Sequence, residues 1–185
     1  MRLLLVRHPR PEVAPGLCYG STDLPAAEED TRRVHAALLA TGLPGTLPVH
    51  ASPLRRCADL ARLIAGERVR FDARLAEMDF GEWELRSWDT IGRDEVDAWN
   101  ADLLHHRPGG GESLLQVARR VAAFRADLCA DLHASGTPEA LVVCHAGTMR
   151  LLAAMHGGVP LEQAALQAAS TPHHIAYGEM LVLEN

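Results

Sequence analysis

Two short apolar runs near opposite ends of the chain constrain its fold more than any other feature. Residues 3–6 are followed by Arg7 and His8, and residues 140–144 are followed by His145. Short continuous apolar runs are typical of strands that are buried on both faces of a parallel sheet. Ligands of open α/β sheets bind just beyond the carboxyl ends of such strands. We therefore expect both histidines to lie at one edge of one sheet, in a single site.

The rest of the chain alternates between helical and extended patterns. Helices are expected over residues 25–41, 54–65, 88–106, 112–135, 147–156 and 160–169, and further strands over 47–51, 69–72 and 177–183. This alternation predicts a predominantly parallel sheet that is covered on both faces, a three-layer α/β/α sandwich. With 185 residues and no repeat or linker, the chain is predicted to form a single domain over residues 1–185.

Composition excludes several classes of protein. The formal net charge of -6 argues against nucleic acid as a partner. No apolar stretch approaches the roughly 20 residues of a membrane span, and the first apolar run is too short for the apolar region of a signal peptide, so we expect neither. The four cysteines form no Cys-x-x-Cys pair, which favours reduced thiols in the cytoplasm. The pattern leaves open whether the chain is a monomer or a homodimer.

Ten histidines raise the question of a metal site. The adjacent pairs at 105–106 and 173–174 are poorly spaced for a shared ion, because neighbouring side chains usually point apart. The sequence has no His-Glu-x-x-His motif and no cluster of thiols. We therefore expect no metal and no cofactor.

Several side chains suit the chemistry of a phosphate ester. The guanidinium of Arg7 offers a fork of donors that matches phosphate, and His8 can attack or accept a proton near neutral pH. Its second ring nitrogen should then donate to a backbone carbonyl. Ser52 and Pro53 predict the start of a helix whose first turn carries two arginines, which oppose the helix dipole. One of them could face an anion, or both could simply be solvated.

A turn-rich segment at residues 75–84 places four carboxylates among aromatic side chains. A carboxyl group packed against apolar groups can have a raised pKa, which suits a general acid. The pattern does not indicate which of the four carboxylates faces a site.

In order and spacing, four motifs resemble those of the histidine phosphatase superfamily, also called phosphoglycerate mutase-like: Arg7-His8, residues 52–55, residues 75–84 and residues 143–148. The resemblance covers nearly the whole chain and implies a phosphoric monoester hydrolase. It implies that His8 is the nucleophile that becomes a phosphohistidine and that Glu77 is the proton donor and later the base. It also implies a phosphate site made by Arg7, Arg55 and His145, and we add Thr148 as a candidate ligand.

The motifs depart from the family pattern at two positions. Pro9 stands where a glycine usually follows the first histidine, and Ala146 stands where the first of two glycines follows the second. Proline removes a backbone N–H, and alanine adds one methyl group. Since neither change removes a reactive side chain, we expect activity, with the loop after His8 altered.

The loop after His8 is similar to that of the α-ribazole-5'-phosphate phosphatases of cobalamin biosynthesis. This resemblance implies that α-ribazole 5'-phosphate, or the cobalamin 5'-phosphate, is the small-molecule substrate. By position, Arg10, Tyr19 and His173 are candidates to contact its organic half. The alternatives are a broad-specificity small-molecule phosphatase, a phosphoglycerate mutase, a non-catalytic protein that binds phosphate esters, and a metal-dependent hydrolase.

Overall fold

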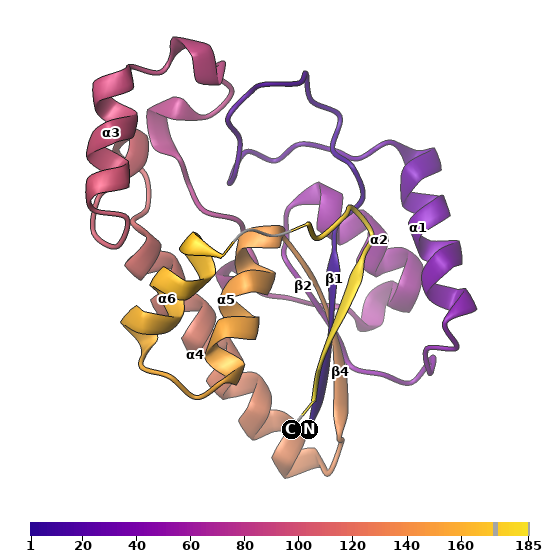
Figure 1. The fold of residues 1–185 in the computed structure, drawn as a ribbon. Coiled ribbons are helices and arrows are strands. Elements are labelled where there is room, and N and C mark those ends of the chain that lie inside the picture. The colour runs from indigo at the N-terminus through magenta and orange to yellow at the C-terminus, as the bar shows by residue number, and fades with distance from the viewer. Residues whose placement is uncertain (172–173, 185) are drawn as a thin grey trace.

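A five-stranded sheet forms the centre of the computed structural model, which describes residues 1–171 and 174–184 (Figure 1). The strand order is β3-β2-β4-β1-β5. Neighbouring strands pair in parallel except at one edge, where β5 runs antiparallel to β1. The strands are β1 Arg2–Arg7, β2 Val49–Ala51, β3 Arg70–Phe71, β4 Glu139–Cys144 and β5 Met180–Glu184.

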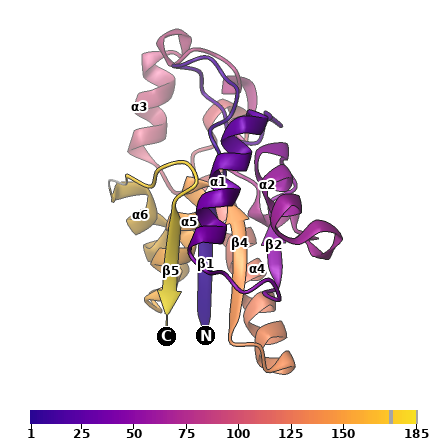
Figure 2. The same cartoon turned by 90° about the vertical axis from the view of Figure 1, so that its right-hand side faces the viewer.

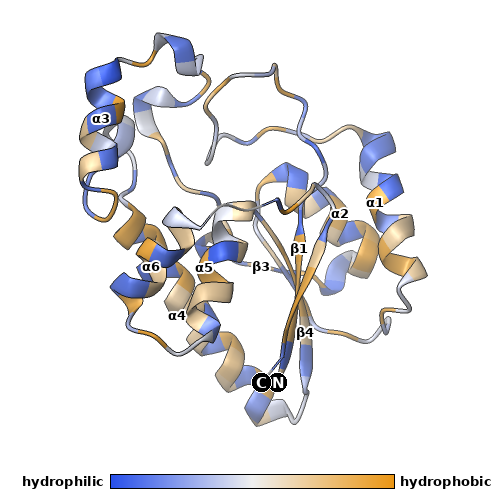
Figure 3. Cartoon of the chain, in the orientation of Figure 1, coloured by the Kyte–Doolittle hydropathy of each residue, from blue (hydrophilic) through white to orange (hydrophobic). Residues whose placement is uncertain are grey.

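Helices cover both faces of this sheet. Helices α1 (Glu28–Ala40) and α2 (Arg55–Ala65) lie on one face, and α4 (Leu114–Ser135), α5 (Ala146–His156) and α6 (Leu161–Ser170) lie on the other. Alternate residues of β1 point to opposite faces, so that Leu4 and Val6 pack with α1 and α2 while Leu3 and Leu5 pack with α4, α5 and α6. The predicted three-layer α/β/α sandwich with a mostly parallel sheet is confirmed. Figure 3 shows the matching hydropathy, with hydrophobic colour along the middle of β1.

The parallel strands end beneath a group of loops. In Figure 2, β4 runs toward the loop of residues 8–27 and toward helix α3 (Arg93–Ala101), whereas β5 runs the opposite way. This arrangement leaves the carboxyl ends of β1, β2 and β4 as the floor of a site.

The structure corrects the helix expected over residues 88–106. Only α3, preceded by a short 3-10 turn at Trp88–Thr90, is formed there. Ile91 turns inward into a small core with Cys18 and Trp83, and the backbone is extended at Ile91 and Gly92. Burial of Ile91 therefore interrupts a pattern that is helical on either side.

The start of α4 agrees with the sequence. Ser113 caps this helix in a capping box, in which its hydroxyl accepts from the N–H of Gln116 and the Gln116 side chain accepts from the N–H of Ser113. Within the described ranges, none of the helices combines the length and the apolar character needed to cross a membrane.

Candidate active site

The two histidines that follow the apolar strands lie next to each other. Strands β1 and β4 are adjacent and parallel, with Arg7 paired to Cys144, so His8 and His145 leave the sheet at the same level. Their ring centroids are 5.0 Å apart. The expected meeting of both imidazoles at one sheet edge is confirmed.

His8 is buried and is held in one orientation. Its Nδ1 lies 2.7 Å from the carbonyl oxygen of Pro9, which can only accept, so Nδ1 carries the proton and Nε2 carries the lone pair. The predicted backbone acceptor is therefore the carbonyl of Pro9, a group that proline retains. Burial, together with the positive charges of Arg56 and Arg7, lowers the pKa of His8 to about 3. The imidazole is thus neutral at physiological pH.

His145 lies directly before α5 and is fully buried. Its Nε2 is 2.9 Å from the hydroxyl oxygen of Ser52 and 3.5 Å from the sulfur of Cys57. Burial is the main reason that the pKa of His145 lies well below its usual value. Electrostatic repulsion from His8 and Arg56 lowers this pKa further. The sequence predicted that Ser52 would cap α2, but the helix begins later, and its N-cap is Leu54. The hydroxyl instead orients the second imidazole.

Arg7 is held beside His8 by the segment that precedes β5. Its Nη1 donates to the carbonyl oxygen of Ile175 at 2.5 Å, and its guanidinium lies 3.9 Å from the ring centroid of Tyr177. The Tyr177 hydroxyl is 2.9 Å from that of Tyr19, and the Tyr177 ring is 5.6 Å from the His8 ring. The sequence did not single out Tyr177 as a site residue.

The arginine of α2 that lies in the site is Arg56, not Arg55. Arg55 is exposed, and its backbone N–H donates to Asp23. Arg56 is fully buried, and its guanidinium donates to the carbonyl oxygens of Thr22 at 2.7 Å and Gly20 at 2.5 Å. The positive charge of Arg56 also acts on His8 and His145. The structure thus corrects the sequence assignment by one residue.

The loop that receives Arg56 is fixed from its other side by Glu84. The carboxylate of Glu84 accepts from the backbone N–H groups of Gly20, Ser21 and Thr22 at 3.0, 2.9 and 3.2 Å. Burial alone would raise the pKa of Glu84, but hydrogen bonds from the Thr22 hydroxyl and from the N–H groups of Phe80, Gly20 and Ser21 lower it. A side chain at Gly20 would collide with the Met78 carbonyl, because its Cβ would lie 1.9 Å from that oxygen.

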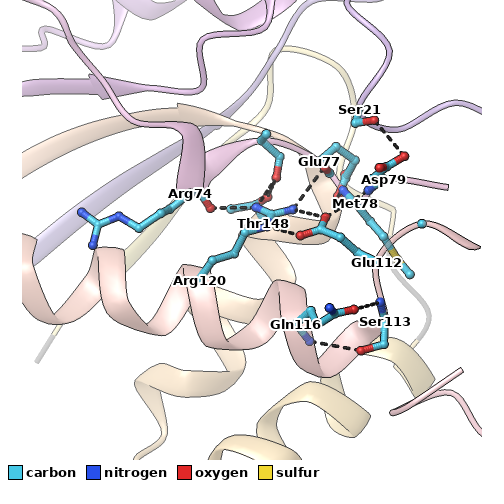
Figure 4. A network of polar contacts seen from close by, with 12 residues as sticks. Ser21, Arg74, Glu77, Met78, Asp79, Glu112, Ser113, Gln116, Arg120 and Thr148 are labelled. Carbon is cyan, nitrogen blue, oxygen red and sulfur yellow. Dashed lines mark hydrogen bonds and ion pairs between the residues drawn. The ribbon is translucent and has the colours of Figure 1, made fainter. Parts of the chain in front are cut away.

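Glu77 approaches the site from the loop after β3 (Figure 4). Its carboxylate accepts from the N–H of Gly147 at 3.0 Å and from the N–H of Met78 at 3.0 Å. The fit against α5 is close, since a Cβ at Gly147 would lie 2.5 Å from Oε1 of Glu77. Of the four carboxylates considered at residues 75–84, Glu77 borders the cavity beside Arg7.

That cavity has a volume of about 490 Å³. Its lining combines polar residues of the site with apolar side chains from the loops, α3, α4 and α5. The apolar members include Met78, Phe80, Trp99, Leu103, Leu114, Val117 and Leu151, with small residues of α5 and α6, and the polar ones include Arg7, Tyr19, Glu77 and Arg150. Such a cavity can hold an organic group next to a phosphate at Arg7.

The remaining sequence candidates lie elsewhere or at the rim. The Thr148 hydroxyl is buried and lies 3.4 Å from the carbonyl oxygens of Leu75 and Ala76, so the structure does not place it as a phosphate ligand. Arg10 is exposed, with its guanidinium 5.4 Å from the Tyr177 centroid. His173 lies outside the described residues. Among residues 1–171 and 174–184, no group of three or more His, Cys, Asp or Glu side chains is arranged to hold a metal.

Comparisons with known proteins agree with this geometry. Residues 3–175 match the model of the histidine phosphatase superfamily, branch 1. An adenosylcobalamin/alpha-ribazole phosphatase of Escherichia coli K12 is 31% identical over 172 residues, which cover 88% of this chain and 82% of the relative. A probable phosphoglycerate mutase of Cronobacter sakazakii is 30% identical over 169 residues, 86% of this chain and 76% of the relative.

A solved structure extends the match to the fold. The crystal structure of the alpha-ribazole phosphatase from Shigella flexneri superposes with a TM-score of 0.78 at 30% identity, covering 98% of this chain and 89% of that one. The chain therefore belongs to the histidine phosphatase superfamily. It is an enzyme of the phosphatase class, a hydrolase.

Proposed function

We propose that this enzyme hydrolyses phosphate monoesters through a phosphohistidine on His8. The observation that carries the proposal is the state of this imidazole. It is buried and neutral, its Nδ1 is held by the Pro9 carbonyl, and its Nε2 therefore keeps the lone pair, with the His145 ring alongside. A neutral imidazole with a free, oriented nitrogen is a competent nucleophile.

In the first step, Arg7, Arg56 and His145 bind the phosphate oxygens and stabilise the charge that builds up during transfer. Nε2 of His8 attacks phosphorus in line with the ester bond, and the P–O bond to the organic group breaks. Glu77 gives its proton to the leaving oxygen, which departs as an alcohol. The product of this step is phosphohistidine and a Glu77 carboxylate.

In the second step, the Glu77 carboxylate takes a proton from water. The resulting oxygen nucleophile attacks phosphorus, and the P–N bond to His8 breaks. Inorganic phosphate leaves, and both His8 and Glu77 return to their starting states. Positive charge comes from two guanidinium groups, so the proposed cycle requires no metal ion.

We propose α-ribazole 5'-phosphate, or the cobalamin 5'-phosphate, as the physiological substrate, with a place in cobalamin biosynthesis. Two relatives bear the alpha-ribazole phosphatase name, and the cavity beside Arg7 has an aromatic and aliphatic lining. A flat, largely apolar base would be buried well against Phe80, Trp99 and Leu103. We assign the activity to the cytoplasm, because the four cysteines, all within the described ranges, are free thiols.

A phosphoglycerate mutase is the second candidate, on the strength of the relative described as a probable mutase. A small substrate with a second anionic group would need a cation deeper in the cavity. Besides Arg7, the cation in the cavity lining is Arg150, whose Nη2 already donates to the carbonyl oxygens of Ala169 and Thr171. The cavity therefore favours an apolar leaving group over phosphoglycerate.

A panel of phosphomonoesters tests the proposal. Purified enzyme in buffer with a metal chelator is assayed for phosphate release from α-ribazole 5'-phosphate, a chromogenic aryl phosphate and 3-phosphoglycerate, with His8→Asn as the control. We expect release that needs His8, survives the chelator and has its highest kcat/KM with α-ribazole 5'-phosphate. Isomerisation of 3-phosphoglycerate without phosphate release would identify a mutase. Activity lost to the chelator would identify a metal-dependent hydrolase.

A further inference from the structure

Arg120 is the side chain that connects the long helix α4 to the loop carrying Glu77 (Figure 4). Residues 76–80 have no regular secondary structure, so no helix or sheet hydrogen bonds fix their backbone. Glu77 must nevertheless hold a carboxylate at the leaving oxygen. An unsupported loop would allow displacements of the size that cost catalysis about 10²-fold.

Every donor of the Arg120 guanidinium is used, three on backbone carbonyls at this loop and two on Glu112. Its Nη1 donates to the carbonyl oxygens of Arg74 at 2.8 Å and Ala76 at 2.7 Å, and its Nη2 donates to that of Glu77 at 3.2 Å. The remaining two N–H groups form a two-pronged ion pair with Glu112, at 2.8 and 2.9 Å. Five donors thus meet five acceptors. Three of these acceptors are backbone carbonyls within four residues of one another, and the last of them belongs to Glu77 itself.

Glu112 holds the loop on the other side of Glu77. Its carboxylate accepts from the N–H of Asp79 at 3.1 Å, and its own N–H donates to the Asp79 carbonyl at 2.8 Å. Glu112 directly precedes Ser113, which caps α4, so its backbone is tied to a regular 22-residue helix. Residues on both sides of Glu77 are therefore pinned to the same rigid element.

We propose that Arg120 and Glu112 are positioning residues that place the Glu77 carboxylate for proton transfer. The inference rests on the proposed function, since it assumes that Glu77 is the proton donor. Arg120 does not line the cavity beside Arg7. It acts by donating to backbone carbonyls. A lysine at this position could not make the same bonds, because an ammonium has three donors and no planar fork.

A comparison of leaving groups separates positioning from general stability. An aryl phosphate such as p-nitrophenyl phosphate releases a stable anion that needs no proton, whereas an alkyl phosphate needs one. For Arg120→Met and Arg120→Lys, we expect kcat/KM on the alkyl ester to fall by about 10- to 100-fold. On the aryl ester it should change by less than about threefold. The parameter kcat/KM is chosen because it reports the first chemical step, in which the proton is donated.

Matched variants complete the experiment. Arg119, the exposed neighbour on α4, serves as the control, and Arg119→Met should leave kcat/KM unchanged on both esters. Glu112→Gln weakens the ion pair with Arg120 but leaves Arg120 in place. This variant replaces the Arg120 variants in the comparison of esters if those fold poorly. In a Glu77→Gln background, Arg120→Met should add little on the alkyl ester, because both changes remove one proton transfer.

Equal losses on both esters, or no loss on either, would overturn the positioning role. Failure of the proposed function would look different. Turnover that persists in His8→Asn, or a Glu77→Gln variant with no preference between the esters, would contradict that function while Arg120 is still intact.

Discussion

At the scale of single residues, the charge state of His8 is set by its surroundings. Burial and the neighbouring Arg56 lower the pKa of His8 to about 3, so this nucleophile stays neutral over the whole range of an ordinary assay. The acid limb of kcat/KM should then follow the ionisation of the substrate phosphate. Profiles for two esters whose phosphates ionise at different pH values should be displaced from each other. An acid limb fixed near pH 6.5 for both esters would point to an ordinary histidine and contradict this expectation.

The two adjacent arginines of α2 allow a matched test. Arg56→Ala removes a buried cation that acts on both imidazoles, and we expect kcat/KM to fall by about 10²- to 10³-fold, as for the loss of one transition-state donor. Arg55→Ala removes an exposed side chain and should change kcat/KM by less than about twofold. Steady-state kinetics of both variants, with thermal melts to check folding, would show the contrast. Comparable losses, or a larger loss at Arg55, would return Arg55 to the site.

The sequence predicted the position of a single residue correctly where a strand end determined it. Arg7, His8 and His145 each end or follow a buried strand, and the sheet brings such positions together. The choice between Arg55 and Arg56 could not be made in this way. Successive helix residues point about 100° apart, and only the packing of α2 decides which one turns inward. Ser52 and Tyr177 enter the site through tertiary contacts that no local pattern records.

At the scale of elements, the contact between α5 and the Glu77 loop separates activity from stability. In Gly147→Ala the new Cβ would lie 2.5 Å from the Glu77 carboxylate, which must move. Alanine is a better helix former than glycine, so the substitution does not itself weaken α5. We therefore expect kcat/KM on an alkyl phosphate to fall by about tenfold or more while the melting temperature is maintained. Gly157→Ala is the control, because a Cβ there makes only an ordinary contact of 3.6 Å. Loss of activity only in step with loss of stability would contradict this interpretation.

Most elements could be predicted because periodicity and caps act locally. The long helix α4 is capped by Ser113 where the sequence predicted its start, and the two apolar runs form β1 and β4. The break before α3 was missed because it depends on burial of Ile91 against distant residues. The antiparallel direction of β5 also had no sequence signal, since it depends on where the chain returns after α6.

At the scale of the whole molecule, the buried imidazole links folding to pH. The unfolded chain protonates His8 below about pH 6.5, whereas the folded chain does so only near pH 3. Between these values the unfolded state binds more protons, so the free energy of unfolding decreases as the pH falls. Removing the group in His8→Asn should reduce this slope by about 1.4 kcal/mol per pH unit. Denaturant unfolding of both proteins between pH 4.5 and 6 would measure it. Parallel slopes for the two proteins would contradict the low pKa of His8.

At this scale, the sequence predicted a predominantly parallel sheet with His8 and His145 at one edge. This prediction was possible because short apolar strands and amphipathic helices leave few ways to bury both faces of a sheet. The cavity beside Arg7 could not be predicted in this way. Its lining comes from the loops and from α3, α4, α5 and α6, and only the folded structure brings these together.

The most direct test of the mechanism is to trap the covalent intermediate. Enzyme mixed with α-ribazole 5'-phosphate or an aryl phosphate is quenched during turnover under conditions that preserve phosphohistidine, and peptide mapping by mass spectrometry locates the phosphoryl group. We expect one phosphoryl group on His8 that is absent from His8→Asn and disappears as substrate is exhausted. Turnover with His8 unmodified at every quench time, or a phosphoryl group on another residue, would contradict the proposed mechanism.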